Sequence, residues 1–365
     1  MSACVCRFAV LTDPHITTPE TYRHYPHRLH RLEYSIPILE AALARLAQEP
    51  LDFLLIPGDL TQHGEPANHT WLSKRLSRLP FPSYVIPGNH DIPPDEGAIP
   101  AAEFPQYYRQ QGYRDTDRLY YAQEILPGLG LIGLNSNQFD PNGQLIGRID
   151  GEQWQWLENC LAQHPWPRTL VMVHHNICEH LPNQSRSILG QRYLLDNRLE
   201  LQQLLKKHGI NLVFTGHLHV QDIAEEDGFF DVTTGSLVSY PHAYRLVTWQ
   251  EDCMHITTER ITTLPDVPHL LQDARAWMEQ RSPQFIVHLL THPPLNLPLE
   301  QAQQLAPRLG HFWPDIAWGD AQFILPDLPS PVREFFEACS DRPPGDNQAV
   351  LPLLTPTSCP KPNLV

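Results

Sequence analysis

Five short polar clusters in the chain contain residue types that bind divalent metal ions. They offer carboxylates, imidazoles and one amide, which are ligands for divalent transition metals of intermediate softness. The clusters are Asp13-Pro14-His15, Gly58-Asp59, Gly88-Asn89-His90-Asp91, His174-His175 and Gly216-His217-Leu218-His219. The 20 histidines among 365 residues are also numerous enough to favour metal binding. The sequence therefore predicts a metal site built from these clusters.

The spacing within the clusters suits shared coordination. On an extended segment, residues i and i+2 point the same way, so Asp13 and His15 are expected to reach one ion. His217 and His219 repeat this spacing. Glycines precede Asp59, Asn89 and His217, and they would let the backbone turn sharply and approach the ions closely.

Most clusters directly follow a short apolar run of the kind that forms a buried strand. These runs span 8–11, 53–56, 84–86, 129–134, 170–173 and 212–214. Helical spacing of apolar residues lies between several of them, at 35–46 (with Ser35 as the expected cap), 154–161 and 199–209. A stretch with antiparallel strand character follows at 229–261. Strands alternating with helices indicate an α/β fold, which places its sites at the carboxyl ends of the strands.

The character of the chain changes near residue 262, where prolines become frequent. We expect a main domain at 1–262 and a proline-rich accessory helical segment at 263–365. Helical patterns in this segment cover 270–278, 299–309 and 332–338. The segment shows no ligand spacing, so it is expected to pack on the main domain or to cap the site.

Composition excludes several classes of partner. A net charge of -15 argues against nucleic acid as the main partner, because that binding needs lysine and arginine to neutralise phosphates. No apolar run reaches the roughly 20 residues of a membrane span, so no membrane partner is expected. Seven scattered cysteines fit reduced thiols better than disulfides. The apolar segment 4–11 is too short for a signal peptide, and a cytoplasmic location is expected.

The order and content of the five clusters resemble the calcineurin-like metallophosphoesterase family. The family pattern is D-x-H, GD, GNH[DE], H and GH-x-H, and this chain has DPH, GD, GNHD, HH and GHLH in the same order. The resemblance covers about residues 7 to 250. It implies an α+β sandwich of the metallophosphoesterase type, with central mixed sheets flanked by helices.

The resemblance also implies a ligand set and a mechanism. The first of two divalent metal ions (Mn, Fe or Zn) would be held by Asp13, His15, Asp59 and His219, and the second by Asp59, Asn89, His174 and His217. His90 is not a ligand in the family and faces the substrate. A metal-bridging hydroxide would attack phosphorus, while His90 protonates the departing oxygen.

The motif details resemble bacterial cyclic-nucleotide and glycerophosphodiester hydrolases. We therefore expect a phosphodiesterase with a small-molecule phosphoester substrate, and we leave homo-oligomer formation open. Gln62 stands where purple acid phosphatases have a tyrosine ligand, so an Fe(III) site of that type is not expected. Asn176 and Ile177 replace the usual Pro-Pro after the histidine pair, which leaves the substrate contacts open. The alternatives are a phosphomonoesterase or nuclease of the same family, or a non-catalytic scaffold that acts as a binding module.

Other polar residues near the clusters have structural interpretations. Asp91 is expected to fix its own loop. His175 is expected either to support a ligand or to face the substrate. His24, His27 and His30 are interleaved with arginines and are expected on a solvated face, with a place at the substrate entrance as the alternative.

Overall fold

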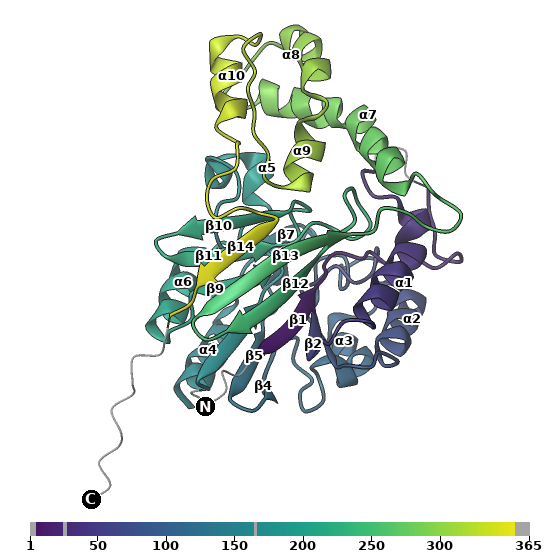
Figure 1. Cartoon of the computed structure of the whole chain (residues 1–365), viewed down its shortest axis with the longest axis vertical. Coiled ribbons are helices and arrows are strands. Elements are labelled where there is room, and N and C mark those ends of the chain that lie inside the picture. Colours follow the sequence, from purple (N-terminus) through teal and green to yellow (C-terminus); the bar gives the residue numbers. More distant parts are fainter. Residues whose placement is uncertain (1–4, 25–27, 164–165, 355–365) are drawn as a thin grey trace, which may run out of the picture.

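The computed structural model describes residues 5–24, 28–163 and 166–354. Two six-stranded mixed sheets face each other, with helices packed outside them (Figure 1). The first sheet has the order β14 (Gln348–Pro352), β13 (Cys253–Arg260), β12 (Ala243–Gln250), β1 (Cys6–Val10), β2 (Phe53–Ile56), β3 (Ser83–Val85). The second has the order β10 (Asp222–Glu226), β11 (Phe229–Thr233), β9 (Leu212–Thr215), β8 (Arg168–Met172), β5 (Leu129–Gly133), β4 (Tyr121–Leu126). A separate hairpin is formed by β6 (Asn137–Phe139) and β7 (Leu145–Gly147).

The main hydrophobic core lies between the two sheets. Phe8 on β1 stacks on Phe53 of β2 at 4.8 Å between ring centroids, and it meets Phe214 of β9 edge-on at 5.6 Å. All three rings are buried. Strands covered on both faces read as continuous apolar runs, which explains why the sequence revealed them.

Helices pack on the outer sides of this sandwich. The core of the first sheet includes α1 (Ser35–Leu46) and α2 (Pro66–Leu76), and a second core joins the other sheet to α4 (Gly151–Gln163) and α6 (Arg198–Lys207). Two short helices, α3 (Phe104–Tyr107) and α5 (Ile188–Gln191), lie in loops. Ser35 is the first helical residue, not the cap, and its Oγ accepts a hydrogen bond from the Thr17 amide at 3.1 Å. The α/β fold with mixed sheets flanked by helices is thus confirmed.

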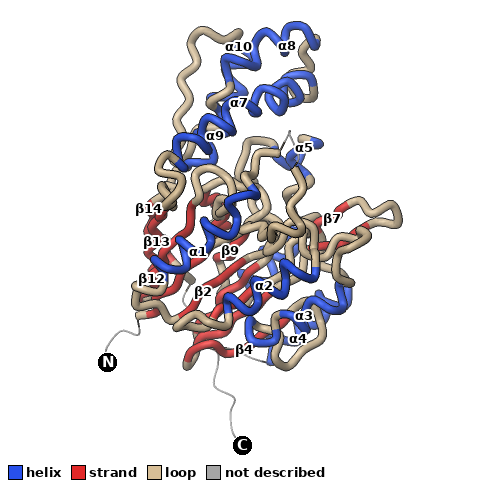
Figure 2. The backbone as a smooth tube through the Cα atoms, turned by 90° about the vertical axis from the view of Figure 1, so that its right-hand side faces the viewer, coloured by secondary structure: helices blue, strands red, loops and turns tan. Residues whose placement is uncertain are grey.

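Within the described residues, the accessory segment contains four α-helices that stand beyond one end of the sheets (Figures 1 and 2). They are α7 (Leu270–Thr291), α8 (Leu299–Leu305), α9 (Phe312–Trp318) and α10 (Ser330–Glu337). Their own hydrophobic core also contains Leu218 and Val220 of the main domain. The chain then returns to the first sheet as β14, an unexpected strand that pairs antiparallel with β13. No helix in the described ranges is long and apolar enough to cross a bilayer.

Candidate metal centre

Five loops at the carboxyl ends of strands bring the expected ligands together. Parallel strands β1, β2 and β3 of the first sheet lead to Asp13, Asp59 and Asn89, and β8 and β9 of the second sheet lead to the histidines. Among the expected ligands, atoms within 4.8 Å of one another form two groups: Asp13, His15, Asp59 and His219, and Asp59, His174 and His217. Asn89 joins the second group, since its Oδ1 lies 3.3 Å from His174 Nε2. All seven side chains proposed as ligands therefore meet at one place.

Five of these residues have left-handed backbone conformations. The φ angles are 50° for Asp13, 41° for His15, 48° for Asp59, 68° for His217 and 60° for His219. A non-glycine residue in this region costs about 1–2 kcal/mol. The expectation of an extended Asp-x-His segment was wrong: the loops bend at the ligand residues themselves, and backbone strain is concentrated at the site.

Two glycines allow the loops to pack this closely. Gly58 has φ of 99°, and a Cβ at this position would overlap the imidazole of His174. A Cβ on Gly216 would collide with the carboxylate of Asp13 and the hydroxyl of Thr12. The close backbone approach expected from the glycines is confirmed at both positions.

In the first group, four side chains direct ligand atoms at one another. His219 Nε2 lies 3.1 Å from Asp13 Oδ1 and 3.3 Å from His15 Nε2, which is 3.7 Å from Asp59 Oδ2. Burial, with the neighbouring His30, holds the pKa of His15 well below its usual range. A neutral imidazole facing two buried carboxylates is the donor set that a divalent cation requires, so the residues fit a metal ion.

In the second group, His174 Nδ1 donates to the Pro57 carbonyl at 2.9 Å, which leaves Nε2 facing Asp59 Oδ1 at 3.4 Å. Burial opposes the charge of His174, but the carboxylates of Asp59 and Asp13 outweigh it and raise its pKa to about 9. The pocket thus favours a positive charge beside Asp59, and a cation would replace that proton. This group also fits a metal ion.

His217 is oriented by the backbone and by His175. His217 Nε2 lies 3.1 Å from the Arg192 carbonyl, so its Nδ1 is the nitrogen available to a metal. The ring of His175 lies 4.4 Å from that of His217, and its Nδ1 is 2.8 Å from Ser136 Oγ. His175 is buried, and burial with the nearby His174 lowers its pKa to about 3. His175 therefore lies behind a ligand as a neutral side chain.

The GNHD loop is tied to Asp59. The amide of His90 donates to Asp59 Oδ1 at 2.9 Å, and His90 Nδ1 donates to the Gln62 carbonyl at 2.8 Å. Asp91 is buried and accepts hydrogen bonds from the amides of Leu60, Thr61 and Gly88. The loop-fixing role expected for Asp91 is confirmed.

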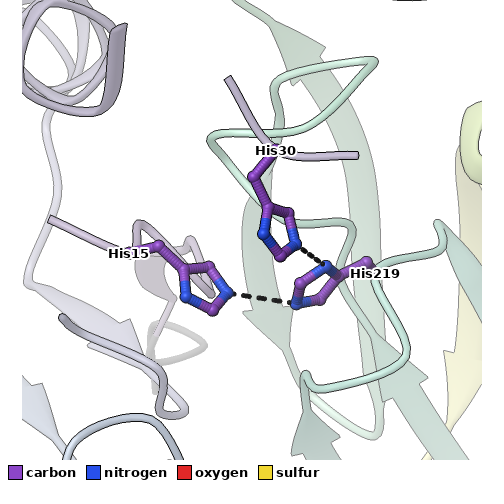
Figure 3. Close-up of side chains that lie close together, drawn as sticks. All are labelled: His15, His30 and His219. Carbon is purple, nitrogen blue, oxygen red and sulfur yellow. Dashed lines mark hydrogen bonds between the residues drawn. The ribbon is translucent and has the colours of Figure 1, made fainter. Parts of the chain in front are cut away.

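His30 was assigned wrongly to a solvated face. Its Nε2 lies 2.9 Å from His219 Nδ1, and its ring stacks on His15 at 4.6 Å between centroids (Figure 3). His24 is exposed as expected, and His27 lies outside the described residues. No ligand-like spacing marks His30 in the sequence, so only the folded loop reveals this contact.

Two mixed sheets with Asp, Asn and His side chains at their strand ends form an α/β fold with a candidate metal centre. A family model described as calcineurin-like phosphoesterase matches residues 6–221. The match covers more than half of the chain, which therefore belongs to the calcineurin-like phosphoesterase family. This confirms the family resemblance and the expected class, a metal-dependent phosphoric ester hydrolase.

Three curated relatives each align with part of this chain. A probable glycerophosphodiester phosphodiesterase of Arcobacter nitrofigilis is 27% identical over 57% of this chain and 70% of that protein. A probable cyclic nucleotide phosphodiesterase of a Synechococcus species is 30% identical over 50% of this chain and 64% of that protein. The 3',5'-cyclic adenosine monophosphate phosphodiesterase of Escherichia coli is 27% identical over 50% of this chain and 58% of that protein. The aligned regions thus cover 58% to 70% of these relatives.

Among solved structures, a dimetal phosphatase of Danio rerio is similar in fold. It aligns with a TM-score of 0.52 over 70% of this chain and 96% of its own, at 14% sequence identity. At that identity the likeness shows the fold alone.

Proposed function

We propose that the chain is a dinuclear-metal phosphodiesterase that hydrolyses a small diester, such as a cyclic nucleotide or a glycerophosphodiester. The carrying observation is that Asp59 belongs to both ligand groups, with Oδ2 toward His15 and Oδ1 toward His174. One carboxylate with an oxygen in each group is the arrangement that a bridging ligand needs. The mixed nitrogen and oxygen donors suit Mn, Fe or Zn.

Two cations bound here would activate a water molecule and neutralise the oxygens of a phosphoryl group. The protein's own part is to position them and to supply a proton. Gln62 fixes the ring of His90 through Nδ1, so a second proton would sit on Nε2 and pass to the departing oxygen. The Asp59 contact with the His90 amide sets this side chain next to the bridging carboxylate.

The names of the relatives favour a diester of small size, and the chain's own residues support that choice. The net charge of -15 disfavours a nucleic acid substrate, so a nuclease is the weaker candidate. A non-catalytic scaffold is disfavoured because none of the seven proposed ligands is missing.

We also propose the division into a metallophosphoesterase domain at 1–262 and an accessory segment at 263–365. The five described cysteines are free thiols, in keeping with a reducing cytoplasm.

The substitution Asp59→Ala tests the bridging role. We expect elemental analysis to find two metal ions in the wild type, loss of both in Asp59→Ala, and no change in Asp115→Ala, which removes an exposed carboxylate. Two full equivalents of metal in Asp59→Ala would contradict the bridging assignment. Hydrolysis of cyclic nucleotides, glycerophosphodiesters, monoesters and single-stranded DNA with Mn, Fe or Zn then separates the candidate activities.

A further inference from the structure

The ligand histidines differ in the groups that hold their outer ring nitrogens. For His174 and His217 the partner is a backbone carbonyl, of Pro57 at 2.9 Å and of Arg192 at 3.1 Å. A carbonyl only accepts hydrogen bonds, so it fixes which nitrogen carries the proton and which is free for a metal. The other two ligand histidines have no such carbonyl partner. His15 Nδ1 is buried without a hydrogen-bond partner among the described residues. His219 Nδ1 faces the Nε2 of His30 (Figure 3).

We propose that His30 is a positioning residue for the first metal position, an inference that rests on the proposed dinuclear site. His219 Nε2 faces Asp13 and His15, so its Nδ1 carries the proton and donates it to His30 Nε2. His30 then holds its own proton on Nδ1. This arrangement orients His219 and leaves its Nε2 lone pair for the metal.

The loop that carries His30 is itself held at both ends. On one side, the Arg31 amide donates to the Val238 carbonyl at 3.3 Å. On the other, Trp277 of helix α7 donates its indole Nε1–H to the Arg28 carbonyl at 3.1 Å. An accessory helix therefore sets the position of a loop that contacts two residues of the first ligand group.

The accessory helices also contact the His219 loop directly. Leu218 lies between His217 and His219 in the sequence and is buried in the core formed with Ile286 and Leu290 of α7. No described residue of the accessory segment belongs to either of these two ligand groups. Its role at the site is instead to support His219 from two directions, through Leu218 and through His30.

The test compares full-length variants loaded with Mn²⁺, with His24→Ala as the control for an exposed histidine of the same segment. We expect His30→Ala to weaken one of two Mn²⁺ equivalents by roughly 10–100-fold in chelator competition. The electron paramagnetic resonance spectrum should change from a coupled pair to a single ion. His30→Gln should largely restore binding because its side-chain carbonyl accepts a hydrogen bond, whereas His30→Leu should resemble His30→Ala.

A second variant separates the hydrogen bond from the support by α7. Trp277→Phe removes the indole donor to the Arg28 carbonyl and keeps an aromatic ring at this position, and we expect a smaller loss at the same metal position. If His30→Ala fails to fold by circular dichroism, the comparison of Gln with Leu, which are similar in size, decides.

Two results would overturn the inference alone: His30→Ala binding both ions with wild-type affinity, or His30→Leu binding them as well as His30→Gln. A wild-type protein that binds fewer than two ions would refute the proposed function, and the inference with it.

Discussion

His90, which we propose as the proton donor, is held in one orientation at this site. Its amide is held by Asp59 and its Nδ1 by the Gln62 carbonyl, so both backbone and ring are oriented by hydrogen bonds. A basic leaving oxygen, such as an alkoxide, needs a proton in the transition state, whereas a nitrophenolate departs without one. The contribution of His90 should therefore depend on the leaving group.

We expect His90→Ala to keep both metal ions, to lose about 10²-fold or more in kcat/KM on alkyl or ribosyl esters, and to lose much less on nitrophenyl esters. Damage to the metal site would slow both substrate classes alike, so their ratio isolates the proton. His255→Ala, on the exposed side of β13, is the control. Equal losses on both classes with intact metal content would assign His90 to phosphoryl binding.

Gly58 and Gly97 allow backbone strain to be separated from overlap with a ligand. Both have positive φ, 99° and 93°, but a Cβ at Gly97 meets no atom within 4 Å, whereas one at Gly58 overlaps His174. We expect Gly97→Ala to cost about 1–2 kcal/mol of unfolding free energy and to keep both metals. Gly58→Ala should cost more and bind the second metal weakly. Urea unfolding and elemental analysis measure both effects, and normal metal content in Gly58→Ala would refute this.

At the scale of elements, the strands that lead to the ligands were predictable because they are buried on both faces. Phe53–Ile56 is an uninterrupted apolar run, and Asp59 follows shortly after its carboxyl end, which predicted that Asp59 lies at the site. Helix α2 was not predicted because it buries the polar Asn68 and His69. Strand β14 follows the accessory helices in the sequence but pairs with β13, which precedes them, and no local pattern indicates this partner. The contact of His30 with His219 was not predicted for the same reason, since the two residues are 189 positions apart in the sequence.

The edge of the second sheet contains a buried charged cluster whose effect on stability depends on pH. His180 lies between Asp222 of β10 and Asp231 of β11, hydrogen-bonded through Nδ1 to the first, with Nε2 3.3 Å from the second. Burial opposes protonation of His180, but the carboxylates of Asp231 and Asp222 outweigh it and raise its pKa to about 10. The native state thus retains a proton that the unfolded chain, at a pKa of 6.5, releases earlier.

This cluster should stabilise the protein fully below about pH 6.5 and lose its effect as the pH rises through about 10. We expect His180→Ala to lower the unfolding free energy by about 3 kcal/mol at pH 6. The gap from wild type should shrink between pH 7 and 10. Urea unfolding with a chelator, at pH 6, 8 and 10, measures this difference in unfolding free energy. The control His255→Ala should unfold with the same free energy as the wild type. A gap that is constant with pH would show that His180 is neutral in the native state.

At the scale of the molecule, the acidic main domain and the accessory helices meet around the His219 loop. Phe336 of α10 is fully buried and lies edge-on to Phe312 at 4.7 Å between ring centroids. The core to which both belong includes Leu218 of the metal-ligand loop. Loosening the accessory core should therefore weaken metal binding at the candidate metal centre.

We expect Phe336→Ala to lower stability by about 3–5 kcal/mol, to expose α7–α10 to limited proteolysis, and to weaken Mn²⁺ binding. Phe285 on α7 is 36% exposed, so Phe285→Ala should have a small effect and serves as the control. A strongly destabilised Phe336→Ala that binds Mn²⁺ like the wild type would show that the two regions are independent.

The pairing of β14 with β13 makes helices α7–α10 an insertion in a hairpin. Thr257 pairs with Gln348, and the Thr258 amide bonds the Asn347 carbonyl, so both ends of the insertion leave the sheet at the same point. Antiparallel neighbours need only a short turn between them. A protein engineer could therefore delete the helices and join Arg260 directly to the start of β14, which would keep β14 paired with β13. A stop codon after Arg260 would instead remove β14 together with the helices.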